Sequence, residues 1–333
     1  MSENFGKYTR AAFFWVIIAE IFIIILSYIP AESLLENGMK ESGMTSNILM
    51  SDGSGRGVDG KYYGTVLGSE LSRDRIVTVT FLDTLETMTD SAWDVSQSKN
   101  GTVMAWTEPN AVERPNLDLF IGAEGKIQAE SCFELFRGYY NVKKIEFNDC
   151  FDTSQVTDMR AMFQYCENLA QLDLGSLDTS QVTSMEAMFN DCTSLAWLNV
   201  SGFDTSQVTN MRGMFCDCSS LAQLDISDFD TSQVTNMQWL FMGCESLTQL
   251  DVSNFDTSQV TDMWGMFCDC SSLAQLNISD FDTSQVTDMR GMFNGCKSLV
   301  QLDISNFDTS RVKDRGGMFE GCAITAEEAN LRR

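Results

Sequence analysis

Residues 221–246 read LAQLDISDFDTSQVTNMQWLFMGCES, and this stretch decides the fold because closely similar stretches precede and follow it. The hexapeptide DTSQVT begins at six positions 26 residues apart, and a variant, DTSRVK, continues the series without an insertion or deletion. A constant period of this size predicts a solenoid, because each unit buries its apolar side chains only by stacking on its neighbours. The hexapeptides begin at Asp152, Asp178, Asp204, Asp230, Asp256, Asp282 and Asp308.

The apolar residues of one repeat follow two different spacings. In residues 221–229 the pattern L-x-x-L-x-I-x-x-F alternates near its centre, which predicts a short parallel strand with one buried face. In residues 234–244 the spacings are three, four and three, which predict a helix of about two turns. Asp230 begins a segment with the spacing of a capping box, and Asp-Thr-Ser also suits an Asx turn, so we expect this aspartate to be structural.

These patterns predict an α/β solenoid, a leucine-rich-repeat-like stack of seven 26-residue coils, each with a short parallel strand and a short helix. Short β-branched and aromatic runs within residues 75–83 and 101–107 predict strands in a small β-rich region before the stack. The predicted parts are a cytoplasmic N-terminus (1–10), a transmembrane anchor (11–30), a flexible stalk (31–60), a β-rich cap region (61–149), the seven repeats (150–322) and a C-terminal cap (323–333).

The N-terminal run AAFFWVIIAEIFIIILSYI, residues 11–29, is long enough to cross the hydrocarbon core of a bilayer as a helix. Lys7 and Arg10 precede it, so the positive-inside tendency places the rest of the chain outside the cell. The sequence thus predicts a single-pass protein attached to the membrane through this helix. A cleaved signal peptide, which would make the protein secreted, is the alternative.

The charge is strongly negative, with 47 Asp and Glu against 22 Lys and Arg. Residues 161–289 carry 18 acidic residues and a single basic one, Arg212. Such a field repels phosphate backbones, so we expect no nucleic-acid partner. The chain also has no histidine, the commonest general base near neutral pH, and we expect no enzymatic activity and no cofactor.

A binding face is predicted on the strand half of the repeats. One outward column alternates carboxylates and amides, and a neighbouring column of glutamines is interrupted by Trp197, an exposed aromatic of the kind enriched in binding hot spots. The oxygen-rich column also suits Ca²⁺, but the spacing of calcium-binding loops is missing. The column consists of Asp173, Asn199, Asp225, Asp251, Asn277 and Asp303.

A second column consists of cysteines that keep the 26-residue period. Stacking would bring neighbouring cysteines within reach of a disulfide or a shared metal ion. Free thiols in a buried apolar column are the other interpretation, and we favour it because each cysteine lies at a predicted core position. The column consists of Cys166, Cys192, Cys218, Cys244, Cys270, Cys296 and Cys322.

The run F-D-T-S-x-V-T-x-M-x-x-M-F-x-x-C-x-S-L-x-x-L-D-I-S resembles the 26-residue repeat of BspA-like leucine-rich-repeat surface proteins of bacteria, and the similarity spans about residues 150–322. This resemblance implies an extracellular or cell-surface protein of a kind associated with adhesion or host interaction. We therefore expect a non-enzymatic protein whose acidic repeat face binds an extracellular protein or glycan. A structural spacer without a specific ligand is the alternative. A hydrolase within residues 61–130 is a third hypothesis, but these residues contain no recognisable nucleophile.

Overall fold

The computed structural model describes residues 47–50, 55–56, 62–63 and 66–325, and the chain divides into two compact units. Unit 1 comprises Met1–Glu130 and Glu146–Asp152, and unit 2 comprises Ser131–Ile145 and Thr153–Arg333. The predicted cytoplasmic N-terminus and anchor, most of the predicted stalk and most of the predicted C-terminal cap lie outside the described residues.

Short strands and one 3-10 helix are the regular elements of the described residues. They are β1 (Ile48–Leu49), β2 (Gly55–Arg56), β3 (Tyr62–Tyr63), η1 (Arg73–Arg75), β4 (Ile76–Leu82), β5 (Trp93–Asp94), β6 (Val103–Pro109), β7 (Leu117–Ala123), β8 (Ile127–Ala129), β9 (Lys144–Glu146), β10 (Phe151–Asp152), β11 (Gln171–Asp173) and β12 (Trp197–Asn199).

Unit 1 is built on strands that lie in the order β5-β6-β7-β4. β6 runs antiparallel to β5 and β7, whereas β4 runs parallel to β7. β4 and β6 lie where the alternating apolar runs predicted strands, and their inward side chains, such as Phe81 and Trp106, are fully buried. A second small sheet of unit 1 places β8 between β1 and β10, all parallel.

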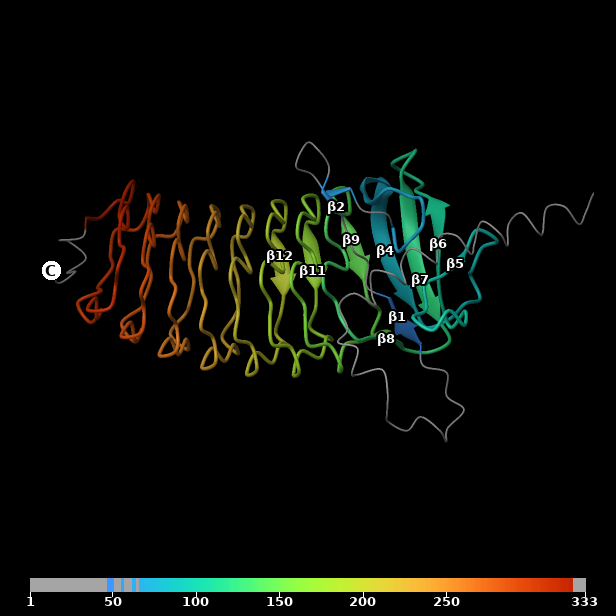
Figure 1. The fold of residues 1–333 in the computed structure, drawn as a ribbon. Coiled ribbons are helices and arrows are strands. Elements are labelled where there is room, and N and C mark those ends of the chain that lie inside the picture. The colour runs from blue at the N-terminus through green and yellow to red at the C-terminus, as the bar shows by residue number, and fades with distance from the viewer. Residues whose placement is uncertain (1–46, 51–54, 57–61, 64–65, 326–333) are drawn as a thin grey trace, which may run out of the picture. The chain divides into compact units, whose positions relative to one another are not determined.

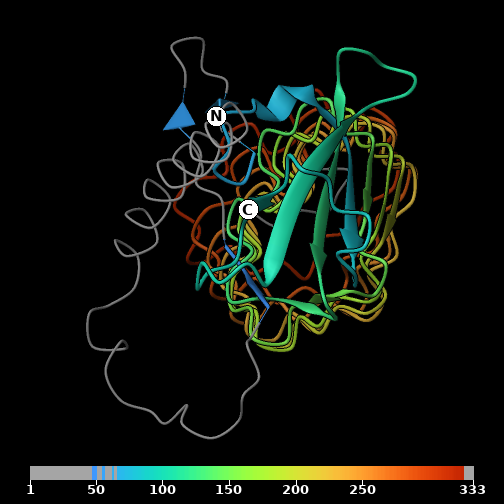
Figure 2. The same cartoon turned by 90° about the vertical axis from the view of Figure 1, so that its right-hand side faces the viewer.

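Unit 2 is a stack of coils that repeat every 26 residues. Figure 1 shows these coils side by side, and in Figure 2 their outlines nearly coincide. Equivalent phenylalanines lie directly above one another, with ring centroids 5.6 Å apart for Phe189 and Phe215 and again for Phe215 and Phe241. The inner phenylalanines and the neighbouring Val, Met, Cys and Leu columns are buried, so the core of unit 2 is one continuous set of apolar columns.

The predicted α/β solenoid is wrong, because residues 131–325 contain no helix. In the segment predicted to be helical, Trp239 and Gly243 have φ values of 58° and 72°, and such left-handed residues interrupt a right-handed helix. Every second backbone N–H there leaves the segment: those of Met237 and Phe241 donate to carbonyl groups of the next coil. The intervening N–H of Leu240 donates back to Met237 and closes a turn. The segment therefore alternates between local turns and bonds to the neighbouring coil.

The predicted short parallel strand is also wrong for most coils, because β11 and β12 are the only strands in residues 153–325. β11 and β12 pair in register, but in the later coils of the described stack the β-pairing on this side is reduced to the bridge between Gln275 and Gln301. Here the backbone hydrogen bonds have lengthened, as from Val300 N to Ala274 O at 3.4 Å. The segments are extended, yet they separate before a ladder forms.

Buried threonines and exposed aspartates of the DTSQVT hexapeptide tie the coils together. Thr231 is buried, and its hydroxyl donates to the carbonyl of Asp256 in the next coil at 2.9 Å. Asp230 accepts a hydrogen bond from the backbone N–H of Ser232 at 2.9 Å, which is the Asx turn that the sequence suggested. Equivalent residues repeat both bonds along the stack.

In the part of the chain that the structure describes, no helix has the length and apolar character needed to cross a membrane. This finding counts against the predicted single-pass anchor, the predicted membrane contact and the predicted membrane-anchored cell-surface location. The segment to which we assigned the anchor, residues 11–30, is outside the described residues.

Candidate functional site

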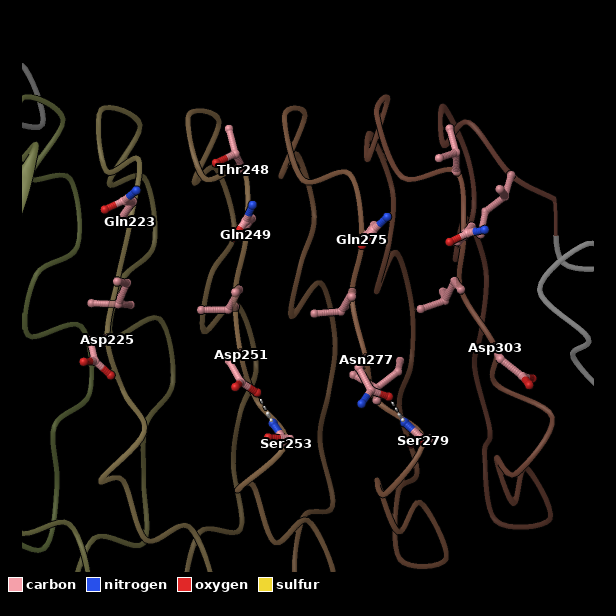
Figure 3. A pocket seen from close by; sticks show the side chains of 18 residues that line it. Gln223, Asp225, Thr248, Gln249, Asp251, Ser253, Gln275, Asn277, Ser279 and Asp303 are labelled. Carbon is pink, nitrogen blue, oxygen red and sulfur yellow. Dashed lines mark hydrogen bonds between the residues drawn. The ribbon is translucent and has the colours of Figure 1, made fainter.

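An open groove of about 1290 Å³ crosses the extended side of four coils in unit 2. Figure 3 shows the polar side chains that line it, arranged in two rows across neighbouring coils. One row contains Gln223, Gln249, Gln275 and Gln301, and the other contains Asp225, Asp251, Asn277 and Asp303. Between the rows lies a column of nearly buried leucines, Leu224, Leu250, Leu276 and Leu302, which belongs to the edge of the core.

The alternation of each extended segment produces these rows. In one coil, Gln223 and Asp225 are exposed whereas Leu224 and Ile226 are buried, as expected when successive side chains point to opposite faces. Because the coils repeat without an insertion, the same side chain recurs at the same height in each. The groove is thus a direct product of the 26-residue period.

The aspartate row is held by its own backbone. Asp251 Oδ1 accepts a hydrogen bond from the N–H of Ser253 at 3.0 Å, and Asp225 Oδ1 accepts the equivalent bond from Ser227 at 3.1 Å. Hydrogen bonds from Ser227 and Ser253 lower the pKa of these two carboxyl groups. They therefore stay ionised at neutral pH, and each keeps a second oxygen for a ligand.

The groove has a pronounced negative charge. Among the described residues that line it, three are carboxylates and none is Lys or Arg. The carboxylates are exposed, so their field acts on a partner without a cost for burying charge. A groove of one sign with an apolar base is suited to a cationic segment that also has aliphatic surface.

The structure brings together four of the seven predicted site residues and leaves three apart. Asp225, Asp251, Asn277 and Asp303 line the groove, whereas Trp197, Asp173 and Asn199 lie in β11 and β12, outside it. Trp197 is 49% exposed and stands beside Gln171 on the neighbouring strand. Asn199 donates to Asp173 Oδ1 at 2.7 Å, so these two side chains satisfy each other.

Val300 is a lining residue that our sequence analysis missed. It is 63% exposed, and the equivalent positions in neighbouring coils carry Ala274, Thr248 and Ala222. A larger apolar residue at a position that is otherwise small is the signal that could have identified it. Val300 extends the apolar base of the groove toward solvent.

The carboxylate row does not form a metal centre in this structure. Among the described residues, no group of three or more His, Cys, Asp or Glu side chains could hold a metal ion. The calcium alternative therefore gains no support from the geometry of the groove.

The cysteine column is structural. The described cysteines form no disulfide, and the Cys244 thiol donates to the carbonyl of Phe215 in the preceding coil at 3.2 Å. Burial raises the pKa of Cys244 to about 12, so its thiol is protonated and a poor nucleophile. The same thiol-to-carbonyl bond recurs at Cys192, Cys218, Cys270 and Cys296.

A cluster of aromatic and basic side chains lies on the turn side of the stack. The rings of Trp239 and Trp264 are 4.9 Å apart, and the guanidinium groups of Arg212 and Arg290 lie 4.7 Å and 4.2 Å from one indole each. Both arginines also form ion pairs, Arg212 with Glu186 at 3.0 Å. The charges of both arginines are therefore balanced by groups of the protein itself, and the cluster holds neighbouring coils together.

A family model described as "Mycoplasma protein of unknown function, DUF285" matches residues 130–249 and 217–330. The two matches overlap and together include every DTSQVT repeat. No curated protein and no solved structure matches the chain.

Proposed function

The chain belongs to the family described as "Mycoplasma protein of unknown function, DUF285", and from its geometry we propose that it is a non-enzymatic binding scaffold whose acidic groove holds a basic polypeptide segment. The observation that carries this proposal is the row of Asp225, Asp251 and Asp303 above an apolar base, with no cationic side chain among the described residues of the groove. The 26-residue repeat also supports placing the chain with the BspA-like leucine-rich-repeat surface proteins, as part of the same proposal.

Charge and shape favour a polypeptide with Lys or Arg side chains. Their aliphatic stems can cover the leucine column while their charged ends reach the carboxylates. The glutamine row offers both donors and acceptors to the backbone of the bound segment. Each exposed ion pair contributes only about 0.2–1 kcal/mol, so three pairs imply weak, salt-sensitive binding.

The test is binding of a fluorescein-labelled octalysine peptide to the full chain, followed by fluorescence anisotropy. The decisive variant replaces Asp225, Asp251 and Asp303 by Asn. Because Asn277 already accepts the equivalent turn bond from Ser279, this change removes three charges and preserves the turns. We expect affinity to fall about tenfold.

The matched control replaces three aspartates of the hexapeptides, Asp178, Asp204 and Asp256, by Asn. These residues make the same Asx turns, at 3.0 Å for Asp178, and the change in charge is identical. The control should retain most of the binding. Equal losses in both triple variants would mean that octalysine responds only to net charge, and absence of binding to the unmodified chain would refute the proposal. A glycan that displaces octalysine from the control variant, and that itself fails to bind the groove variant, would be the ligand of the groove in place of a basic peptide.

A further inference from the structure

The coils of unit 2 are joined by a directional ladder of backbone hydrogen bonds. In each inner coil four N–H groups, at every second residue, donate to carbonyl groups of the following coil. The last such set runs from Met289, Gly291, Phe293 and Gly295 to Asp314, Gly316, Met318 and Glu320, at 2.8 to 3.0 Å. The direction is the same along the stack, so the last described coil presents donors.

The equivalent donors of that coil are Arg315, Gly317, Phe319 and Gly321. No described residue accepts a hydrogen bond from their N–H groups. The alternate N–H groups of this coil form their normal turns, for example from Glu320 to the Gly317 carbonyl at 3.0 Å. The coil thus has the conformation of the inner coils and differs in having a row of four outward donors. A row of this kind is a template for an added strand.

The apolar core continues to the same edge. Phe319 stacks on Phe293 with ring centroids 5.5 Å apart, but it is only half-buried, whereas Phe293 is fully buried between two rings. Its second face has no described ring against it. An added segment that places a large apolar side chain there would extend the aromatic column by one step.

Basic residues gather at this edge beside the exposed carboxylates of Asp314 and Glu320, and Asp314 already pairs with Arg290 at 3.6 Å. Arg311, Lys313 and Arg315 are all exposed, at positions where the preceding coil has Gln285, Thr287 and Met289. Like charges oppose the pairing of two copies through this edge, as charged residues commonly do at sheet edges. The same charges attract an acidic segment.

We infer that the edge formed by Arg315, Gly317, Phe319 and Gly321 binds an extended, acidic polypeptide segment, whose carbonyl groups accept the four backbone N–H groups and whose large apolar side chain covers Phe319. This binding adds one more rung to the ladder and is independent of the acidic groove. The groove is lined by carboxylates and has no Lys or Arg, whereas this edge carries three exposed basic residues, so one chain could hold a basic and an acidic partner at once.

The probe is a peptide with blocked ends and the sequence VTSMEAMFN, which occurs at residues 182–190. Within the stack, the carbonyl groups of this stretch, including those of Glu186 and Met188, accept the equivalent set of bonds. Hydrogen–deuterium exchange of the full chain is then measured with and without the peptide. In the free chain, the four edge amides should exchange at least 100-fold faster than those of Met289, Gly291, Phe293 and Gly295. The peptide should slow them at least tenfold and leave the inner amides unchanged.

Two variants test the recognition. Arg315→Glu should weaken peptide binding severalfold, whereas Lys297→Glu, an equal change in charge at another exposed position, should not. A peptide with Lys in place of its Glu should also bind more weakly. Edge amides that are already protected in the free chain would show that the edge is occupied and would overturn the inference. Unchanged exchange on adding the peptide, or self-association in place of peptide binding, would overturn it too.

Discussion

The phenylalanine column makes the energetics of the stack directly testable. Phe241 is fully buried and lies between Phe215 and Phe267, at 5.6 Å and 5.7 Å. Phe241→Ala removes a buried ring and both of its stacking contacts, and the neighbouring coils cannot close the cavity without breaking their ladder. Loss of a buried Phe costs about 3–5 kcal/mol, and each ring contact contributes about 0.5–1.5 kcal/mol of additional stabilisation. We therefore expect a loss near the upper end, about 4–5 kcal/mol.

Phe319→Ala is the matched control. Phe319 is half-buried and has one ring neighbour, Phe293, so its removal should cost about 1–2 kcal/mol. Both variants are compared with the unmodified chain by urea denaturation followed by circular dichroism. If Phe241→Ala costs no more stability than Phe319→Ala, ring stacking between neighbouring coils does not stabilise the inner part of the column.

Three further predictions concern polar and titratable groups of the stack. Thr231→Val should lower the free energy of unfolding by about 1–2 kcal/mol, because the Asp256 carbonyl loses the hydroxyl that donates to it. Thr231→Ser keeps this hydroxyl and should retain most of the stability. Thermal denaturation of the two variants measures the difference. Burial and the nearby Asp217 raise the pKa of Asp191 to about 6, above its unfolded value of about 3.9. The contribution of Asp191 to stability is therefore greatest below about pH 4 and is lost as the pH rises to about 6. In urea titrations at pH 7.5 Asp191→Asn should be more stable than the unmodified chain, and an unchanged dependence of stability on pH would contradict this. The Cys244 thiol, with its raised pKa, should resist iodoacetamide at pH 8 in the folded chain and react once urea unfolds it, as mass spectrometry would show.

The repeat period was enough to predict which residues are buried, because burial in a stack depends on position within the period. The columns of Phe241 and Cys244 were read as core positions, and both residues are fully buried. The same reasoning placed Asp225 and Asp251 on an exposed row, where the structure has them. It could not define the limits of the groove, which does not include Trp197.

The helix prediction failed for an identifiable reason. Spacings of three and four residues place side chains on one side of a helix, but a chain of tight turns with left-handed residues at every fourth position brings the same side chains inward. Small or turn-forming residues at these positions, such as Gly213, Gly265 and Asp217, are the signal in the sequence. Trp239 obscures that signal, because a bulky residue rarely has a positive φ.

The period, the core columns and the acidic character of one face follow from the order of residues alone, because they depend only on which side chains recur every 26 positions. The backbone path was decided by contacts between coils. An N–H group in one coil can bond within its own segment or to the next coil, and only stacking makes the second choice available. Once the coils stack, alternate N–H groups donate to the next coil and are no longer available for the hydrogen bonds within a helix. On the other side of the stack, the extended segments lie far enough apart to leave a groove.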